Sequence, residues 1–464
     1  MTEIAQGSSR EHLLIVSQDL VNSKMAGPGI RYLEMAKCLS HELDVTLAVP
    51  AETSLKFPEI NILRYFEDRP ESLQLLVENA DIVLISGYMI LKFPFLANCK
   101  QRLVVDLYDP IVFENLHYFQ DEPQINQDNQ NKQAINVTNS LAKIGDFFIC
   151  GNERQRDLWM GVLMANGRIN PKTFTQDNSL SSLIDIVGAG FPDRPPRSVP
   201  FLRKMVPEIP ENARVILWGG GIWNWLDPLT LVNAWPDVLA VHPEARLVFL
   251  GTRHPNPVVP DHEMAFKTVQ LAEQLGEKDK SIIFFEWISY EDREALLCES
   301  DVGVTLHPIH VETRYSIRTR VLDYLWAKLP VLITDGDVTS QWVREFNIGI
   351  VVPPDDSKAV SKALLELLDR PKSTWEPNFA TLPDRMSWSH AVKPLLNYCL
   401  YGRHAPDRVP GENPIALPVA MPSARPVGLG QGILRAAYIL RSKGLVAAWH
   451  QIIFHLKWLI SHKR

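Results

Sequence analysis

The densest group of residues able to do chemistry lies at 312–324, between a predicted strand and a predicted helix that begins near Arg318. Three arginines fall at the N-terminal end of this helix: Arg314, Arg318 and Arg320. Positive charge there opposes the helix dipole, so folding alone does not favour it. A bound diphosphate would compensate both the arginines and the free N–H groups of the helix. We therefore expect Ser316, Arg318 and Arg320 to bind phosphate, and Asp323 to accept hydrogen bonds from a ribose diol.

Two glycine-rich turns follow predicted strands. Gly27 and Gly29 lie between the first strand and the first helix, and Gly220 and Gly221 follow the strand at 215–218. Because glycine has no side chain, the backbone can approach a phosphate or a sugar closely at such turns. Each turn can equally be a simple bend, and the tryptophans beside the second turn can line a base or sugar pocket or merely pack. The second turn is not GxGxxG, and no acid ends the next strand, which argues against a nicotinamide cofactor.

The elements that would position these residues alternate between strand and helix patterns over residues 12–188, and again from residue 214. Such alternation predicts two domains with parallel sheets. Parallel sheets bind ligands at the carboxyl ends of their strands, so two such domains in succession would enclose a cleft. The predicted fold class is α/β, with two Rossmann-like doubly wound domains. The predicted boundaries are 1–195 for the first domain, 200–375 for the second and 376–402 for closing helices.

A proline-rich segment and a basic segment follow. Proline recurs every four residues from Pro406 to Pro426, which excludes a helix and predicts an extended linker over 403–430. Residues 431–464 contain arginine and lysine but no acid, and their apolar residues repeat with helical spacing. A basic amphipathic helix favours an anionic membrane surface, although it can equally pack on the body of the protein or on a partner subunit.

The composition of the 464-residue chain is that of a globular protein, with 46% hydrophobic and 22% charged residues. A formal charge of -7 gives no general attraction for nucleic acid. The five cysteines are scattered without CxxC spacing, which argues against a disulfide framework or a zinc site and favours a reducing compartment. The polar first residues show no secretory signal, and no apolar run is long enough to span a bilayer. We expect a cytoplasmic protein, peripheral on the inner face of the cell membrane if its terminal helix binds there.

Residues 322–332, Leu-Asp-Tyr-Leu-Trp-Ala-Lys-Leu-Pro-Val-Leu, resemble the LEAMAxGxPVI segment of the retaining GT-B glycosyltransferases of family 4, the glycosyltransferase group 1 set. The resemblance extends over residues 12–400, approximately. It implies the GT-B fold, in which two Rossmann-like domains face a cleft. It also implies that Asp323 takes the place of the glutamate that binds the donor ribose, and that Gly27 and Gly29 match the family's glycine loop.

The carboxylates expected to be catalytic depart from the family pattern. The family has a second acid eight residues before the one at the position of Asp323, but this chain has Tyr315 there. Glu312 is therefore the carboxylate expected to take the role of that second acid. In the first domain, Asp109 lies in the region where the family often has a catalytic histidine. His117 is its rival for that role.

The basic residues that hold the diphosphate depart from the pattern as well. The family has an arginine and a lysine shortly after the first strand of the second domain, and this chain has neither between Val215 and Ala245. The available substitutes are Arg253, Arg318 and Arg320, and the resemblance does not choose among them.

The activity that the resemblance implies is transfer of a sugar from a nucleoside-diphosphate sugar to a hydroxyl of a saccharide or lipid-linked saccharide, with retention. Arginines and a helix end would stabilise the leaving group, so no cofactor is expected and no metal is required. The DxD sequence at 335–337 is a metal motif of another glycosyltransferase fold, and is interpreted here as a turn with an acid cap. Two alternatives stay open: a sugar-nucleotide epimerase of the same fold, and a scaffold without catalysis in polysaccharide assembly.

Overall fold

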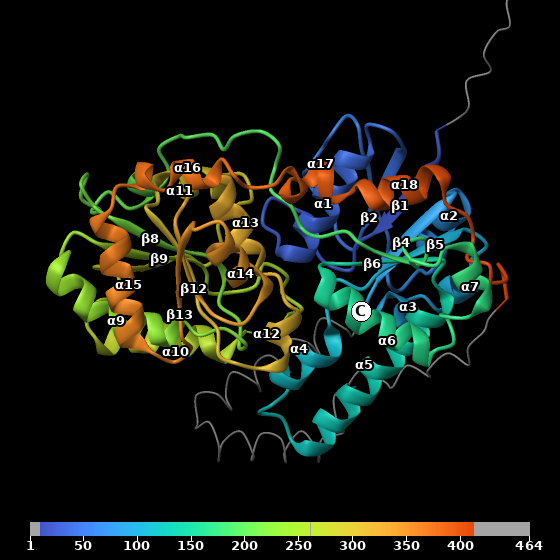
Figure 1. The fold of residues 1–464 in the computed structure, drawn as a ribbon, viewed down its shortest axis with the longest axis horizontal. Helices are drawn as coiled ribbons and strands as arrows, with labels where there is room; N and C mark the ends of the chain where they lie inside the picture. Colours follow the sequence, from blue (N-terminus) through green and yellow to red (C-terminus); the bar gives the residue numbers. More distant parts are fainter. Residues whose placement is uncertain (1–9, 260, 413–464) are drawn as a thin grey trace, which may run out of the picture. The chain divides into compact units, whose positions relative to one another are not determined.

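The computed structural model describes residues 10–259 and 261–412. The first domain is built on a parallel sheet of seven strands in the order β3-β2-β1-β4-β5-β6-β7 (Figure 1). Its strands are β1 (His12–Val16), β2 (Asp44–Val49), β3 (Asn61–Arg64), β4 (Ile82–Ser86), β5 (Arg102–Asp106), β6 (Phe147–Cys150) and β7 (Ile184–Ile186). Its helices are α1 (Gly27–Leu39), α2 (Glu71–Glu78), α3 (Met89–Lys92), α4 (Ile111–Tyr118), α5 (Gln124–Ile144), α6 (Glu153–Ala165) and α7 (Pro171–Gln176).

The second domain is built on a parallel sheet of six strands in the order β10-β9-β8-β11-β12-β13. Its strands are β8 (Val215–Gly221), β9 (Arg246–Gly251), β10 (Ile282–Phe284), β11 (Val302–Thr305), β12 (Val331–Thr334) and β13 (Gly349–Val352). Its helices are α8 (Leu202–Met205), α9 (Pro228–Val241), α10 (Glu263–Gln274), α11 (Asp292–Glu299), α12 (Val311–Tyr315), α13 (Thr319–Trp326), α14 (Val338–Glu345), α15 (Ser357–Asp369) and α16 (Glu376–Phe379). The predicted fold class, two doubly wound α/β domains, is confirmed.

The central strands of both sheets are continuous apolar runs. Every residue of β4 and of β12 is buried. A parallel sheet covered by helices on both faces has no side that meets water, so its strands do not alternate between apolar and polar residues. Neighbouring residues of β4 belong to two different hydrophobic clusters, one on each face of the first sheet, and a third cluster forms the core of the second domain.

Two segments that cross between the domains lie side by side. The chain leaves the first domain past Phe191 and returns past Ser387, and these residues pair as a parallel β-bridge. The Phe191 N–H donates to the carbonyl of Met386 (2.9 Å), and the Trp388 N–H donates to the carbonyl of Phe191 (3.0 Å). Glycine is required at Gly190, because a Cβ there would lie 2.6 Å from the backbone nitrogen of Trp388. The two crossings are therefore joined by hydrogen bonds.

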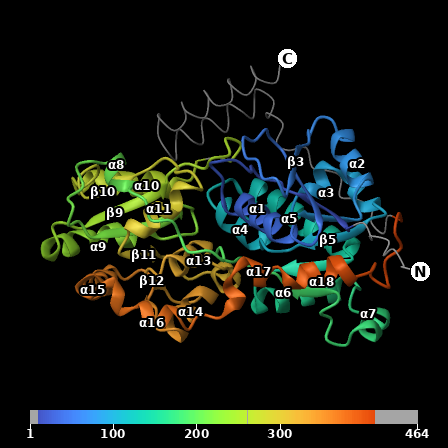
Figure 2. The same cartoon turned by 90° about the horizontal axis from the view of Figure 1, so that it is seen from above.

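The last helices, α17 (Trp388–Ala391) and α18 (Lys393–Tyr401), pack on the first domain rather than the second (Figures 1 and 2). They cover the face of the first sheet that also carries α1. The ring of Tyr398 stacks on that of Phe147 in β6, with centroids 4.4 Å apart. Residues of β1 and α18 belong to one hydrophobic cluster. The first domain is therefore formed by segments that lie almost four hundred residues apart along the chain.

Residues 403–412, the first part of the predicted linker, also pack on the first domain. Arg168 pairs with Asp407 (2.9 Å), and Arg408 pairs with the buried Asp146. These ion pairs hold the segment against the body, so an extended linker does not begin at residue 403. The remainder of the predicted linker and the predicted basic helix lie outside the described residues. No helix within the described ranges is long and apolar enough to cross a membrane.

Candidate functional site

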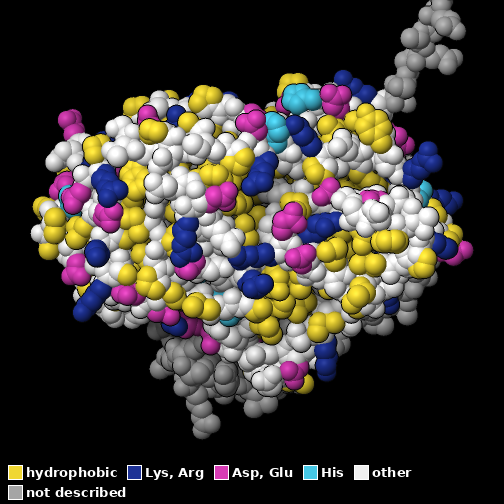
Figure 3. Space-filling model, viewed as in Figure 1, with side chains coloured by type: hydrophobic (Ala, Val, Ile, Leu, Met, Phe, Trp, Pro, Cys, Tyr) yellow, Lys and Arg dark blue, Asp and Glu magenta, His cyan; other side chains and the backbone are white. Residues whose placement is uncertain are grey.

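A cavity of about 370 Å³ lies where the two domains meet. The first domain lines it with the glycine turn at the start of α1 and with the segment that follows β5. The second domain lines it with the end of β8, the segment after β10 and the start of α13. Most of these segments follow the carboxyl ends of parallel strands, where α/β sheets bind ligands. Figure 3 shows acidic and basic side chains interspersed on one face of the molecule, without a broad region of one sign.

The cavity brings together most of the residues predicted to form the site. Those that line it are Gly27, Asp109, Gly220, Gly221, Glu312, Ser316, Arg318, Arg320 and Asp323. The other two, Gly29 and Arg253, do not. A Cβ at Gly29 would collide with the carbonyl oxygen of Leu20, so this glycine serves packing, whereas Gly27 has open space around its Cα. Arg253 is exposed and pairs with the surface carboxylates of Asp261 and Glu286, each at 3.4 Å.

Glu312 and Arg318 form a buried ion pair just before α13. Arg318 Nη1 and Nη2 donate to the two carboxylate oxygens of Glu312 (3.0 and 2.9 Å), and Ser316 Oγ donates to the same carboxylate. The two side chains are only 6% and 2% exposed. Burial opposes ionisation of Glu312, but Arg318 and these hydrogen bonds hold its pKa below the ordinary value. The two charges compensate each other, so Arg318 is not a free cation for a phosphate group.

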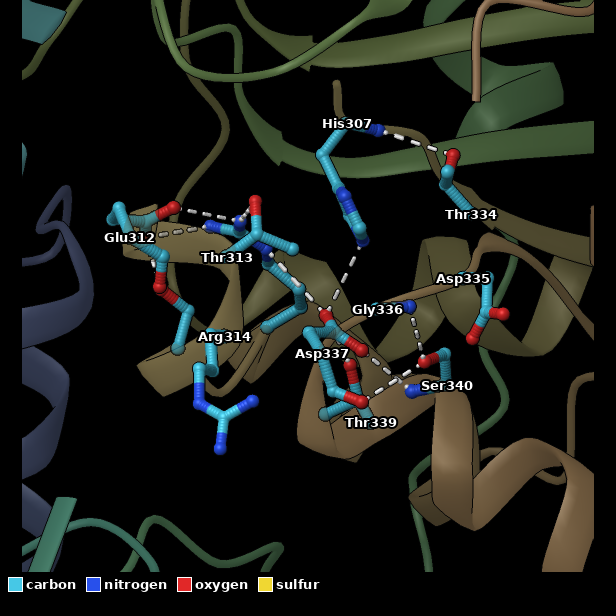
Figure 4. Close-up of polar contacts among 12 residues, drawn as sticks. His307, Glu312, Thr313, Arg314, Thr334, Asp335, Gly336, Asp337, Thr339 and Ser340 are labelled. Carbon is cyan, nitrogen blue, oxygen red and sulfur yellow. Dashed lines mark hydrogen bonds and ion pairs between the residues drawn. The ribbon is translucent and has the colours of Figure 1, made fainter. Parts of the chain in front are cut away.

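Asp337 supports Arg318 from the second domain's interior. Its carboxylate lies 3.6 Å from Arg318 Nε and 3.5 Å from His307 Nε2, and all three side chains are buried. It also caps α14, because it accepts a hydrogen bond from the Ser340 N–H (2.6 Å; Figure 4). Asp335 points elsewhere and pairs with Arg344. The DxD sequence thus forms a turn with an acid cap, as predicted, and both its carboxylates have protein partners.

Arg320 is a cation whose charge is poorly compensated. It is 8% exposed, and Nη2 donates to the carbonyl of Gly221 (2.8 Å). Its Nη1 is buried without a hydrogen-bond partner among the described residues. Its guanidinium lies over the ring of Trp218, 4.9 Å from the centroid. Burial lowers the pKa of Arg320 to about 10. A buried guanidinium with an open N–H group is a position that an anion would complete.

Asp323 is paired with Arg293 of α11, a residue that the sequence analysis missed. Their nearest atoms are 3.2 Å apart, and both side chains are mostly buried. Burial raises the pKa of Asp323, although Arg293 and Arg320 oppose this rise. Arg293 Nε is buried and has no partner in the described part of the chain, and the guanidinium lies over the ring of Tyr290 (4.2 Å). A ribose diol that donates hydrogen bonds to Asp323 would therefore either bind beside Arg293 or displace Arg293 from the carboxylate.

The first domain contributes two carboxylates to the cavity, Asp109 and the unpredicted Glu114. Burial raises the pKa of Asp109 to about 6, and the nearby Asp106 adds to the rise. Burial and the charge of Asp109 raise the pKa of Glu114 as well. Asp106 itself is neutralised by Arg31 (2.8 Å), another lining residue that the sequence analysis missed. Carboxyl groups with raised pKa values can take up or release protons near neutral pH.

His117, the rival to Asp109, does not line the cavity. Its ring lies against that of His310, with centroids 3.9 Å apart. Beside them the ring of Phe113 stacks on that of Tyr315 (5.4 Å). These pairs join α4 of the first domain to α12 and the segment before it in the second. Their geometry assigns His117 to the contact between the domains.

The second domain matches a known family, and the whole fold matches solved structures. Residues 213–370 match the family described as Glycosyl transferases group 1. No curated protein matches the chain by sequence. The fold is similar to sucrose-phosphate synthase from Thermosynechococcus elongatus, at 14% identity and TM-score 0.58, over 84% of this chain and 98% of that one.

Two further solved structures have the same TM-score. One is WaaG, a glycosyltransferase involved in lipopolysaccharide biosynthesis, with 14% sequence identity and a TM-score of 0.58. The match covers 84% of this chain and 100% of WaaG. Anabaena HepE in complex with UDP-glucose is 12% identical, with 84% and 99% covered, at TM-score 0.58. The chain therefore has the GT-B glycosyltransferase fold, and its second domain carries the match to glycosyl transferases group 1.

Proposed function

We propose that the protein transfers a sugar from a nucleoside-diphosphate sugar to an acceptor hydroxyl in the cavity between its domains. The observation that carries the proposal is Arg320, a buried cation with an open N–H group beside Gly220 and Gly221. A diphosphate there would supply the missing anion and would accept hydrogen bonds from the backbone of the glycine turn. The UDP-glucose held by HepE supports a donor of this class.

The residues of the cavity suggest a division of roles. Breaking the bond between sugar and diphosphate builds negative charge on the diphosphate, and Arg320 is placed to stabilise it. Asp323 would accept hydrogen bonds from the ribose, and Glu312 would act by fixing Arg318 rather than by touching the sugar. No described residue donates a hydrogen bond to the carboxylate of Asp109 or of Glu114, and of these two we assign Asp109 to the reacting sugar or the acceptor hydroxyl.

We also propose that the transfer needs no metal ion, because cationic side chains and backbone donors are placed to carry the diphosphate charge. The two DxD carboxylates, which would be the obvious ligands, are held by Arg344 and by the cap of α14. The corresponding test is nucleotide binding with and without a chelator. A binding constant that falls in EDTA and returns with Mg²⁺ or Mn²⁺ would contradict this part of the proposal.

The acceptor we propose is a saccharide or lipid-linked saccharide, with retention at the transferred sugar and attachment to the inner face of a membrane through residues 431–464. The support for membrane attachment is the basic amphipathic pattern of that segment. An enzyme is favoured over a scaffold because Glu312, Arg318, Arg320 and Asp323 converge on one cavity. A scaffold without catalysis would have no reason to keep a poorly compensated arginine there.

The test is a thermal-shift screen with UDP, GDP, ADP and dTDP and their glucose conjugates. A ligand at a hundredfold its Kd adds about 2.7 kcal/mol to the free energy of unfolding, which raises the Tm visibly. We expect one nucleotide to stabilise the wild type and the Arg314→Gln variant, but not Arg320→Gln. Arg314 is the matched control, because it is exposed, lies outside the cavity and points away from Asp337 (Figure 4). No response in the wild type, or a full response in Arg320→Gln, would overturn the proposal.

A further inference from the structure

One end of the cavity is walled by a cluster of aromatic rings, which we call the aromatic cluster. Its members line the cavity and are Tyr118, Trp223, Trp225, His254, His262 and Trp287. The ring of Trp223 is central, with centroid distances of 4.7 Å to His262, 5.4 Å to His254, 6.1 Å to Trp287 and 6.2 Å to Trp225. The tryptophans are half-buried, so part of each ring is open to an occupant.

The aromatic cluster is built onto the ends of two strands. A Cβ at Gly221, the last residue of β8, would collide with the ring of Trp223. A Cβ at Gly251, the last residue of β9, would lie 2.6 Å from the ring of Trp287. These glycines therefore let the rings lie directly on the backbone. Because Arg320 donates to the carbonyl of the same Gly221, the cluster begins where the proposed diphosphate position ends.

His262 shows that the aromatic cluster is more than packing. It is 7% exposed, yet its Nδ1 has no hydrogen-bond partner among the described residues. Burial lowers its pKa to about 4, so the ring is neutral at physiological pH. A neutral imidazole offers one donor and one acceptor, and a buried ring nitrogen without a partner is costly. A ligand hydroxyl could satisfy it.

The shape of the aromatic cluster suits a sugar ring better than a nucleobase. A planar base between two rings needs them parallel and about 7 Å apart, twice the usual contact distance of about 3.5 Å. Trp223 is tilted by 33° to Trp287 and by 31° to Trp225, at shorter spacings. Rings tilted in this way leave no flat slot for a base between them, whereas a puckered ring with one apolar C–H face needs only one ring to lie against.

The position of the aromatic cluster also favours a sugar as its ligand. Tyr118 comes from α4 of the first domain, and its ring meets His262 of the second edge to face (5.7 Å). The cluster thus bridges the two domains, where a transferred sugar and its acceptor must come together. Two of its members, Trp223 and Trp225, lie in the segment after β8, where the chain holds no arginine or lysine between Val215 and Ala245.

We propose that the aromatic cluster is a sugar subsite, which holds the apolar face of a pyranose ring on Trp223 and a ring hydroxyl on His262. The proposal rests on the proposed function, since the sugar belongs either to the nucleotide donor or to the acceptor. Both sources share the same chemistry, a pyranose with an apolar face, and the experiment separates them.

The experiment measures Kd by calorimetry for wild type, Trp223→Leu and the control Trp342→Leu. Trp342 is a half-buried tryptophan of α14 that does not line the cavity. The probes are the four nucleoside diphosphates named above, their glucose conjugates, and the methyl glycosides of glucose, mannose and rhamnose with the diphosphate present. Trp225→Leu serves as a second variant if Trp223→Leu does not fold.

For a donor sugar, Trp223→Leu should bind the nucleotide sugar about tenfold more weakly, equivalent to about 1.4 kcal/mol, while the bare diphosphate binds as before. For an acceptor sugar, only the methyl glycosides should lose affinity. Equal weakening of bare diphosphate and conjugate would mean base stacking and would overturn the proposal, as would no weakening of any probe. If no nucleotide binds the wild type, the proposed function itself has failed. Binding of the methyl glycosides then decides whether the aromatic cluster is a sugar subsite.

Discussion

Arg318 and Arg320 are two residues apart and both buried, yet their replacement by glutamine should change the stability of the unliganded protein in different ways. Arg318 is surrounded by the carboxylates of Glu312 and Asp337. Arg320 has one backbone carbonyl, Gly221, and no carboxylate within ion-pair distance among the described residues. We therefore expect Arg318 to stabilise the folded protein and Arg320 to lower its stability when no ligand is bound.

The magnitudes follow from the charges. Burial lowers the pKa of Arg320 well below its ordinary value, to about 10, and one pKa unit is about 1.4 kcal/mol, so burying this charge costs on the order of 3 kcal/mol. Replacing Arg320 by glutamine removes this cost, but it also removes the charged hydrogen bond to Gly221, which stabilises the folded state by about 1.5–3 kcal/mol. Arg320→Gln should then leave the free energy of unfolding unchanged or raise it by about 1 kcal/mol. Arg318→Gln leaves two buried carboxylates without their guanidinium and should lower it by about 3–5 kcal/mol.

The assay is urea unfolding of the full chain near pH 7 without nucleotide, followed by circular dichroism and compared at the midpoint. Arg314→Gln is the control and should lie within about 0.5 kcal/mol of wild type, as surface changes usually do. A loss of stability in Arg320→Gln as large as that in Arg318→Gln would show that Arg320 is a structural residue. The assignment of Arg320 to an anion would then lose its physical basis.

Three further predictions concern other parts of the chain. The folded state raises the pKa of Asp109 from 3.8 to about 6, so the stability that its protonated form contributes is complete below pH ~4 and lost as pH rises through ~6. Tm measured against pH should show Asp109→Asn equal to wild type near pH ~4, rising above it between pH ~4 and ~6, and higher by a constant amount above pH ~6; parallel curves would refute this. Gly29→Ala should lower the Tm, because its Cβ meets the Leu20 carbonyl, whereas Gly27→Ala should keep the Tm and weaken nucleotide binding; equal Tm values would contradict the assignment. Deleting residues 431–464 should abolish co-sedimentation with phosphatidylglycerol vesicles, and unchanged co-sedimentation would rule out that membrane contact.

The parts of the fold that sequence predicts well are those whose pattern is local. The helix expected from Arg318 is observed as α13, Thr319–Trp326, because its apolar face repeats with helical spacing. The strand expected to stop at Trp218 instead continues as β8 to Gly221, since its last residues still pair with β9 through a shifted register. Glycine has low strand propensity, and only the neighbouring strand shows that the chain stays extended there.

Most residues predicted for the site do line the cavity, but their contacts could not be predicted from the sequence. Glu312 and Arg318 were both expected in the site, but their mutual ion pair depends on a single helical turn, α12, that has no strong local pattern. Arg293 and Arg31 find their carboxylate partners 30 and 75 residues away along the chain, and no spacing rule connects such positions. The sequence therefore indicates which charges are present, while the fold decides which of them remain available to a ligand.

The paired crossings at Phe191 and Ser387 constrain how the two domains can move. A single crossing would allow one domain to rotate about several axes, whereas we expect two adjacent segments joined by hydrogen bonds to favour rotation about one axis. Rotation about such an axis would change the separation of the two cavity walls while keeping them aligned. A ligand that bridges Arg320 and Asp109 then has only one rotation to arrest, which keeps small the entropy lost when the cavity closes.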